Sequence, residues 1–268
     1  MYAASDHTFV ICAYKENPYI EDTIRSLEGQ SVLGNIVLST STPNAYLKQI
    51  CGRHGIKMIV NPHPHLAGDD WNFGYDYAET PLVTLAHQDD YYEPNYLEQI
   101  LSVLNNYGSK RQEVSLLFSD YYEIRNGRRE QENRLLRIKR AMNGILKYKA
   151  FNKSTFVKKR VLSLGCSICC PSVTLVKQIA GKSIFDTQLK NSCDYLTWVN
   201  LAFKPGSFVY VPEKLLGHRI YEESATSKNL NEDIRRGEDE QILSMLWPKG
   251  VARLINSVYS KSEKSNQL

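Results

Sequence analysis

The sequence lacks long apolar runs, a recognisable leader and a disulfide framework. No stretch approaches the roughly 18 uncharged apolar residues that a membrane-spanning helix needs. The N-terminus has no basic region followed by an apolar core, so we expect no secretory signal. Six cysteines in 268 residues, mostly within apolar or helical stretches, favour a reducing compartment. These absences together predict a cytoplasmic protein.

The net charge is small, +4, but the positive charges are unevenly distributed along the chain. Residues 125–160 contain thirteen Lys or Arg and two Glu, about +11, and because the whole chain carries +4, about −7 remains for the rest. This basic segment favours an anionic partner, such as a membrane surface, a lipid phosphate or nucleic acid, over a merely solvated helix face. We expect no nucleic acid partner, because no nucleic-acid-binding module is recognisable.

Three closely spaced cysteines, Cys166, Cys169 and Cys170, are a weak candidate for a zinc site, with Cys193 as a possible fourth ligand. The spacing lacks a second paired half. Free cysteine is among the most buried residue types, so packing in the core is the favoured interpretation.

The first half of the chain alternates between short apolar strands and amphipathic helices. We expect helices at 20–27, from 46, at 71–77 and from Pro94, and strands at 9–14, 35–40, 56–60, 81–86 and 114–119. Strands separated by helices predict an α/β fold with a mostly parallel, doubly wound sheet. The second half is less regular. There we expect a helix at 186–203, a strand at 207–212, a short helix at 238–246 and frayed residues at 261–268.

His87-Gln88-Asp89-Asp90 follows the apolar run 81–86 and is the most informative motif. Ligands of open α/β sheets bind at the carboxyl ends of the strands, where this motif lies. Adjacent carboxylates repel each other, and a divalent cation relieves that repulsion while it binds a phosphate. The alternative is that the two aspartates cap the helix that begins near Pro94.

The order of the motifs resembles the inverting glycosyltransferases of family 2, which have a GT-A fold. The resemblance spans about residues 8–226 and depends on ordered segments rather than on any single one. These segments are 9–17, 20–31, Asn72 with Gly74, 87–94, 117–120, 171–173, 193–198 and 212–226.

The resemblance implies a GT-A, Rossmann-like α/β fold, with a mixed, mostly parallel sheet flanked by helices and a smaller C-terminal acceptor-side region. Residues 1–124 would be the half that binds the nucleotide-sugar donor. Residues 125–226 would contain the basic segment and the acceptor-side half of the same domain. Residues 227–268 would form a helical tail.

The resemblance also implies roles for individual residues. Asp194 would be the general base, unless it only caps a helix, and Asp89 would bind Mn²⁺ or Mg²⁺. His87 would be a second metal ligand and suits Mn²⁺ better. Arg219 would hold the diphosphate, with a surface ion pair as the alternative. The donor-binding residues would be Ala13, Tyr14, Glu16, Ser39, Asp70, Asn72, Gln88, Asp89 and Arg219.

Three positions depart from the family pattern. The family's aspartate after the second strand is missing, so recognition of the nucleotide base would depend on the hydroxyls of residues 39–42 or on Asp70. His87 replaces the first aspartate of the Asp-x-Asp motif. Cys193 replaces the glutamate beside the expected base. The pair Asp89 and Asp194 is retained.

We therefore predict an inverting hexosyl- or N-acetylhexosaminyltransferase that uses a nucleotide-sugar, expected to be UDP-linked. The acceptor would be a saccharide or a polyprenyl-diphosphate-linked saccharide in bacterial surface-polysaccharide biosynthesis, with residues 125–160 against the inner face of the plasma membrane. The alternative is a non-catalytic sugar-nucleotide-binding or scaffold protein on the same fold. A nucleotidyltransferase is disfavoured because residues 13–17 contain no glycine.

Overall fold

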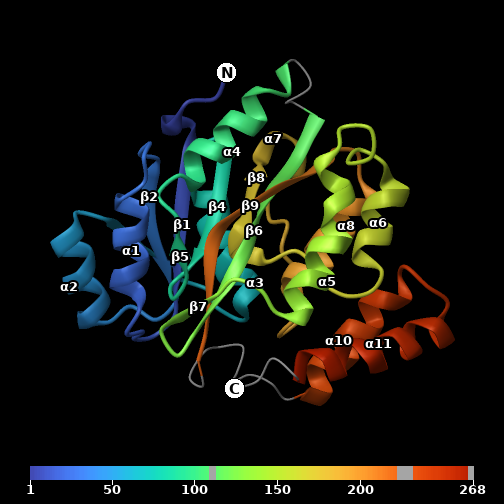
Figure 1. Ribbon diagram of the computed structural model, residues 1–268. Coiled ribbons are helices and arrows are strands. Elements are labelled where there is room, and N and C mark those ends of the chain that lie inside the picture. The colour runs from blue at the N-terminus through green and yellow to red at the C-terminus, as the bar shows by residue number, and fades with distance from the viewer. Residues whose placement is uncertain (109–112, 222–231, 265–268) are drawn as a thin grey trace.

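The chain folds around one mixed sheet, seen in a computed structural model that describes residues 1–108, 113–221 and 232–264 (Figure 1). Within these residues the strand order is β3-β2-β1-β4-β8-β6-β9-β5, with β7 paired to β6. The first four strands are parallel. They are β1 (His7–Ala13), β2 (Asn35–Thr40), β3 (Lys57–Val60) and β4 (Leu82–His87).

The second half of the chain extends the same sheet beyond β4. There β8 is antiparallel to both of its neighbours, β4 and β6, while β6 is parallel to β9. The strands of this half and the short edge strand before it are β5 (Tyr91–Tyr92), β6 (Val114–Arg125), β7 (Arg128–Glu130), β8 (Val173–Val176) and β9 (Ser207–Ile220). The expected mixed, mostly parallel α/β sheet flanked by helices is confirmed.

Helices cover the two faces of the sheet (Figure 1). One apolar cluster contains α1 (Ile20–Glu28), α2 (Ala45–His54) and α4 (Tyr96–Asn105). The other contains α3 (Ala67–Tyr77), α6 (Thr155–Leu162) and α8 (Cys193–Phe203). The remaining helices of the described residues are α5 (Arg134–Asn143), α7 (Lys177–Ala180), α10 (Glu232–Ser244) and α11 (Lys249–Lys264).

The central strand β1 shows why the apolar runs of the sequence are continuous. Phe9 and Ile11 belong to one cluster and Val10 to the other, and all three side chains are fully buried. Successive side chains of a strand point to opposite faces, so a strand covered on both faces needs apolar residues at every position. Each such side chain contributes about 1.5–3 kcal/mol through burial.

The helix expected at residues 186–203 begins only at Cys193. Oδ1 of Asp186 accepts hydrogen bonds from the backbone N–H groups of Gln188 and Leu189, each at 2.8 Å. Such local bonds from an aspartate side chain compete with helix formation. Residues 186–192 therefore form a non-helical segment that leads into α8.

Strands β6 and β9 are longer than expected, and the tail contains α11 after α10. Strand β9 continues from residue 212 to Ile220 and pairs with the far end of β6, past a bulge near Asp120. Residues 261–264 belong to α11 and were wrongly expected to be frayed, while 265–268 lie outside the described residues. The division of the chain at residues 124 and 226 stays a prediction. Strands from both sides of residue 124 share one sheet.

Candidate active site

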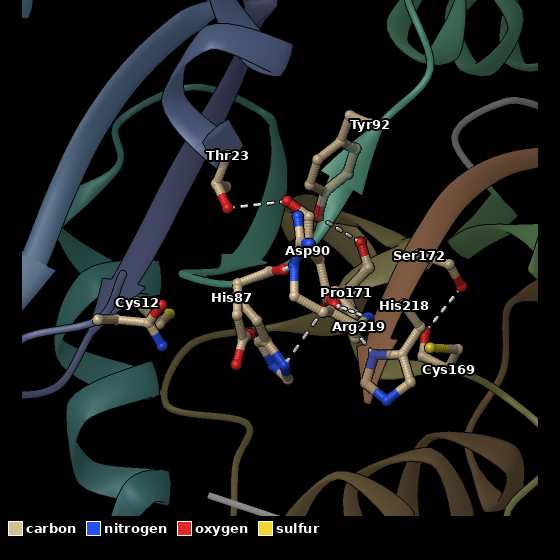
Figure 2. Close-up of polar contacts among 12 residues, drawn as sticks. Cys12, Thr23, His87, Asp90, Tyr92, Cys169, Pro171, Ser172, His218 and Arg219 are labelled. Atoms are coloured by element: carbon tan, nitrogen blue, oxygen red, sulfur yellow. Dashed lines mark hydrogen bonds and ion pairs between the residues drawn. The ribbon is translucent and has the colours of Figure 1, made fainter. Parts of the chain in front are cut away.

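Asp90 anchors the turn that follows β4 and is fully buried. Its Oδ1 accepts hydrogen bonds from Nδ1 of His218 at 3.0 Å and from the backbone N–H of Arg219 at 2.9 Å, and its carbonyl accepts one from the Thr23 hydroxyl at 2.8 Å (Figure 2). Burial alone would raise the pKa of Asp90, but the charge and hydrogen bond of His218 lower it. The turn is therefore fastened to the end of β9 by an ionised carboxylate.

The alternative that these aspartates cap a helix is wrong. The N-cap residue of α4 is Asn95, and Asp90 is occupied by partners on β9. The two carboxylates thus stay at the carboxyl edge of the sheet, as the motif predicted.

Asp89 is partly buried beside Asp90, and Oδ2 of its carboxylate accepts a hydrogen bond from the Tyr221 hydroxyl at 2.8 Å. Burial raises the pKa of Asp89, and the neighbouring charge of Asp90 raises it further. Nε of Arg219 donates to the backbone carbonyl of Asp89 at 2.8 Å. The turn thus presents a carboxylate whose orientation is set by the end of β9.

Arg219 has several protein contacts of its own. Its guanidinium lies over the Tyr19 ring, 4.0 Å from the centroid, and 3.6 Å from the carboxylate of Asp22. Together with the bond to Asp89, these contacts leave its side chain 12% exposed. The expectation of an ion pair is thus met by Asp22, and a contact of Arg219 with a diphosphate stays a prediction.

His87 stacks on the Trp71 ring, with centroids 5.3 Å apart, and its Nδ1 lies 3.9 Å from Oδ2 of Asp90. Within the described residues, Nε2 of His87 and Oδ2 of Asp90 are buried without a hydrogen-bond partner. Burial lowers the pKa of His87, which favours the neutral imidazole that a metal ion requires.

These donors fit a divalent cation only in part. Neutral imidazole and carboxylate oxygens suit Mn²⁺. The described residues contain no group of three or more His, Cys, Asp or Glu side chains able to enclose a metal ion. Sites completed by substrate phosphates need only one or two protein carboxylates. The set around Asp89 therefore fits a cation that binds together with a diphosphate.

Gln88 fixes the loop after β1. Its Oε1 accepts the backbone N–H of Tyr14 at 3.0 Å and its Nε2 donates to the Tyr14 carbonyl at 3.2 Å. The next residue, Lys15, has a φ of 58° and donates its N–H to the Thr42 hydroxyl at 2.5 Å. Both ends of the Gln88 amide are thus bonded to Tyr14, so Gln88 positions this loop, and its expected contact with the donor stays a prediction.

The other donor-binding residues expected in this region lie at the carboxyl end of β1. Ala13 is the buried last residue of β1, whereas Tyr14 is 52% exposed and Glu16 is also exposed. An exposed aromatic ring at this position is available for stacking. Contacts of Tyr14 and Glu16 with a nucleotide stay predictions.

Ser39 is buried under α3, and its expected contact with a nucleotide base stays a prediction. It is 3% exposed and lies beneath α3, where a Cβ added to Gly74 would come within 3.1 Å of its hydroxyl. Asp70 is the better candidate, because it is only partly buried and its carboxylate accepts hydrogen bonds from the Ser41 hydroxyl at 2.5 Å and from Nδ2 of Asn61 at 2.8 Å. These bonds hold an acidic group at the ends of β2 and β3.

Asn72 makes structural contacts with both ends of its amide, and its expected contact with the donor stays a prediction. Its Nδ2 donates to the Phe185 carbonyl at 2.8 Å, and its Oδ1 accepts the Phe185 N–H at 2.9 Å. The side chain is 9% exposed. Asn72 therefore joins α3 to the segment before α8.

Asp194 lies in the first turn of α8, whose N-cap residue is Ser192, so Asp194 is not the cap. Burial raises the pKa of Asp194, while the N–H of Tyr195 and the charges of Arg235 and Lys139 lower it by less. A carboxyl group with a raised pKa is a better proton acceptor. Trp198, one turn further along α8, is buried in the core.

The segment around Cys169 relates Asp194 to the aspartate turn. Burial raises the pKa of the Cys169 thiol, and the charges of both Asp90 and Asp194 add to the rise. The segment is held by Tyr92, whose hydroxyl donates to the Pro171 carbonyl at 2.7 Å (Figure 2). The charges of Asp90, in the turn after β4, and of Asp194, in α8, thus both act on the Cys169 thiol.

The cysteines do not form a zinc site in the part of the chain that is described. All six are free, and burial raises the pKa of each of the four near Asp194, which disfavours the thiolate that zinc needs. Packing in the core, the favoured interpretation, fits this environment.

Two residues of the site were not identified from the sequence. His218 and Tyr221 contact the aspartate pair, and each lies about 130 positions from its partner. Both fall in the closing segment 212–226 of the resemblance. The pairing of β9 with β6 and β5 brings them to the turn, and no local pattern shows that pairing.

A mixed α/β sheet with paired aspartates at its carboxyl edge is typical of glycosyltransferases of the GT-A class. The family model described as "Glycosyl transferase family 2" matches residues 8–180, and the chain belongs to this family. None of the curated proteins matches the chain significantly by sequence.

Solved structures agree with this fold at low identity. TarS 1–349 from S. aureus has a TM-score of 0.63 at 13% identity, with 88% of this chain and 64% of that chain covered. Mannosyltransferase PcManGT from Pyrobaculum calidifontis, in complex with GDP-Man and Mn²⁺, has a TM-score of 0.62 at 10% identity, with coverage of 97% and 75%. This chain thus spans just under two thirds of TarS 1–349, and likeness at these identities shows the fold alone.

Proposed function

We propose that this glycosyltransferase moves a hexosyl or N-acetylhexosaminyl group from a UDP-linked donor to an acceptor hydroxyl, with inversion. The acceptor is a saccharide or a polyprenyl-diphosphate-linked saccharide in polysaccharide assembly. The observation that supports the proposal is the pair of adjacent carboxylates after β4, Asp89 and Asp90, held at the carboxyl edge of the sheet by Tyr221 and His218 in a chain of this family. The complex of TarS 1–349 with UDP-GlcNAc supports a UDP-linked donor by analogy.

On the donor side, Asp89 and His87 would hold Mn²⁺, or less readily Mg²⁺, together with the diphosphate. The cation, when bound, offsets the negative charge that develops on the leaving diphosphate. Tyr221 orients the carboxylate of Asp89 through its hydroxyl, at 2.8 Å. Asp70 and the exposed ring of Tyr14 flank the expected position of the nucleoside.

On the acceptor side, Asp194 acts as the general base. The acceptor oxygen forms a bond to the anomeric carbon as the bond to the diphosphate oxygen breaks, and the hydroxyl proton passes to the Asp194 carboxylate. A single displacement of this kind inverts the anomeric configuration. Because burial raises the pKa of Asp194, we expect activity to fall with decreasing pH as this carboxylate becomes protonated.

The decisive experiment measures nucleotide release from UDP-GlcNAc, UDP-glucose, UDP-galactose and GDP-mannose in the presence of Mn²⁺. We expect release from at least one UDP-sugar, stimulated by an acceptor saccharide. Binding without release would favour the non-catalytic alternative. Neither binding nor release would exclude both.

Variants then assign the roles. Asp194→Asn should lower the release rate by about 10²-fold or more and leave UDP binding intact. Asp89→Ala should weaken Mn²⁺-dependent UDP binding by about tenfold or more. Asp6→Asn is the control, because Asp6 precedes the amino end of β1, at the opposite edge of the sheet. Full turnover in Asp194→Asn would assign the base to another residue, with Asp120 the next candidate.

We also propose that the basic segment contacts an anionic membrane at the cytoplasmic face. Residues 134–160 contain ten Lys or Arg and no Asp or Glu, and six of these cations are exposed, namely Arg134, Arg137, Lys147, Lys149, Lys153 and Arg160. Between these cations lie exposed apolar side chains, namely Ile138, Ile145, Tyr148, Phe151 and Phe156. Cations interleaved with apolar groups suit the interface of an anionic bilayer. Among the described residues, no helix is both long and apolar enough to span a membrane, so this contact would be peripheral.

A further inference from the structure

Helix α10 reaches the segment that precedes α8, although the two helices are far apart in the sequence. Oε1 of Glu238 accepts the backbone N–H of Lys190 at 2.7 Å. Its Oε2 accepts those of Asn191 at 2.9 Å and Ser192 at 3.0 Å. Glu238 is only 9% exposed. One buried carboxylate thus binds three consecutive N–H groups.

The next residue of α10 adds a fourth bond. Oδ1 of Asp239 accepts the Ser192 hydroxyl at 2.8 Å, and Asp239 is 3% exposed. Because the Ser192 side chain is used in this way, it makes no capping hydrogen bond to its own helix, although it is the N-cap residue of α8. The start of α8 is therefore stabilised by carboxylates from another helix.

These contacts are strong for their type. The N-terminus of a helix carries a partial positive charge, so a carboxylate beside it is favoured. Hydrogen bonds to an ionised acceptor are about twice as strong as those between neutral groups. The segment 190–192 has no regular secondary structure of its own before α8, so Glu238 is the main group that fixes its backbone.

Asp194 is the residue whose position depends on this arrangement. It lies two residues after Ser192, in the first turn of α8. Arg235, one turn before Glu238 and Asp239 on α10, carries a charge that acts on the Asp194 carboxyl group. Helix α10 therefore affects Asp194 through the backbone and through charge.

We propose that Glu238 is a positioning residue for Asp194, with Asp239 and Ser192 in support. The inference rests on the proposed function, in which Asp194 is the base. A displacement of about 1 Å at a reacting group can cost on the order of 10²-fold in rate. Loss of the Glu238 bonds should therefore reduce turnover without reducing donor binding, because Asp89 and Asp70 are on other elements and their side-chain hydrogen bonds go to residues outside the segment that Glu238 holds.

The experiment compares Glu238→Gln with Glu240→Gln in the full chain. Glu240 is on the same helix, and its carboxylate pairs with exposed Arg253 at 2.9 Å. With the UDP-sugar that wild type cleaves, we expect kcat to fall about tenfold in Glu238→Gln, with KM for the donor and Kd for UDP within about twofold of wild type. The control should keep both constants.

If Glu238→Gln does not fold, Ser192→Ala replaces it, since this variant removes only the bond to Asp239. Its kcat should fall by about threefold with an unchanged donor KM. Wild-type kcat in the folded variant, even with a lower Tm, would overturn the inference and leave the proposed function standing. A fall in kcat matched by an equal loss of affinity for UDP would overturn the inference as well. A wild-type protein that releases no nucleotide would instead overturn the proposed function.

Discussion

Asp90 and His218 are 128 residues apart in the sequence, yet Oδ1 of Asp90 lies 3.0 Å from Nδ1 of His218. Burial disfavours the charged imidazole, but the charge and hydrogen bond of Asp90 outweigh this and raise the pKa of His218. The two side chains thus form an ion pair whose carboxylate is fully buried. The pair ties the turn of β4, with its candidate metal ligand, to the end of β9.

Removing the cation of this pair should be costly. His218→Gln would leave the buried Asp90 carboxylate without its charged partner, and we expect the free energy of unfolding to fall by about 3 kcal/mol. The control is His65→Gln, because His65 is 75% exposed and lies 3.8 Å from Asp69. Exposed pairs contribute at most about 1 kcal/mol. Urea unfolding of both variants measures their free energies of unfolding. Equal losses in the two variants would contradict a buried ion pair between Asp90 and His218.

A variant of Asn72 tests whether this residue has a structural role or binds the donor. Asn72→Asp keeps the oxygen that accepts the Phe185 N–H but replaces the donor to the Phe185 carbonyl with a second oxygen. We expect a loss of about 1–3 kcal/mol in the free energy of unfolding, because a buried carbonyl loses its partner. Calorimetric binding of UDP should stay within about twofold of wild type. A large loss of UDP binding at unchanged stability would favour the donor-binding role.

Local patterns predicted the parts of the fold that local forces determine. The continuous apolar residues of β1 and the apolar stripe of α4 identified those elements, and the motif at residues 87–90 was correctly placed at the sheet edge. The start of α8 was placed seven residues early, because the bonds of Asp186 to its own backbone have no signature in an apolar pattern. Apolar patterns in the sequence therefore predict helices and strands best where burial along the element is regular.

The partners of the site residues were harder to predict, because tertiary structure brings them together. The resemblance placed Ser39 and Asn72 near the donor but did not show that α3 covers Ser39 or that Phe185 occupies Asn72. His218 and Glu238 contact segments many residues away. Their roles follow only from the positions of β9 and α10 in the folded chain.

The membrane proposal predicts salt-dependent binding to acidic lipid. The protein should co-sediment with phosphatidylglycerol vesicles at low salt, less so at high salt, and weakly with phosphatidylcholine. Arg137→Glu combined with Lys147→Glu reverses two exposed charges and should weaken this binding by about tenfold or more, since each basic residue contributes about 1 kcal/mol.

A charge-matched variant controls for net charge. Lys48→Glu with Lys57→Glu makes the same change on α2 and β3, where both lysines are exposed. It should retain most of the vesicle binding. Equal losses in the two double variants, or binding to duplex DNA in preference to acidic vesicles, would count against a membrane-facing segment.

The last prediction concerns pH and a histidine remote from the site. His7 is fully buried in β1, and its Nε2 lies 2.8 Å from the Thr84 hydroxyl. Burial lowers the pKa of His7 from 6.5 to about 3. Between these values the unfolded chain binds a proton that the folded protein does not, so stability should fall as the pH drops below 6.5. At about pH 5 the loss should be about 2 kcal/mol.

His7→Gln should remove this part of the pH dependence, because the amide does not titrate. Thr84→Val is the control: it deletes the hydroxyl but keeps the imidazole, so it should lower stability by a similar amount at both pH values. Urea unfolding at about pH 7.5 and about pH 5 gives the decrease in the free energy of unfolding between the two pH values. This decrease should be about 2 kcal/mol larger in wild type and in Thr84→Val than in His7→Gln. Parallel losses in all three proteins would mean that His7 is protonated in the folded state, and that the interior beside β1 admits a charge.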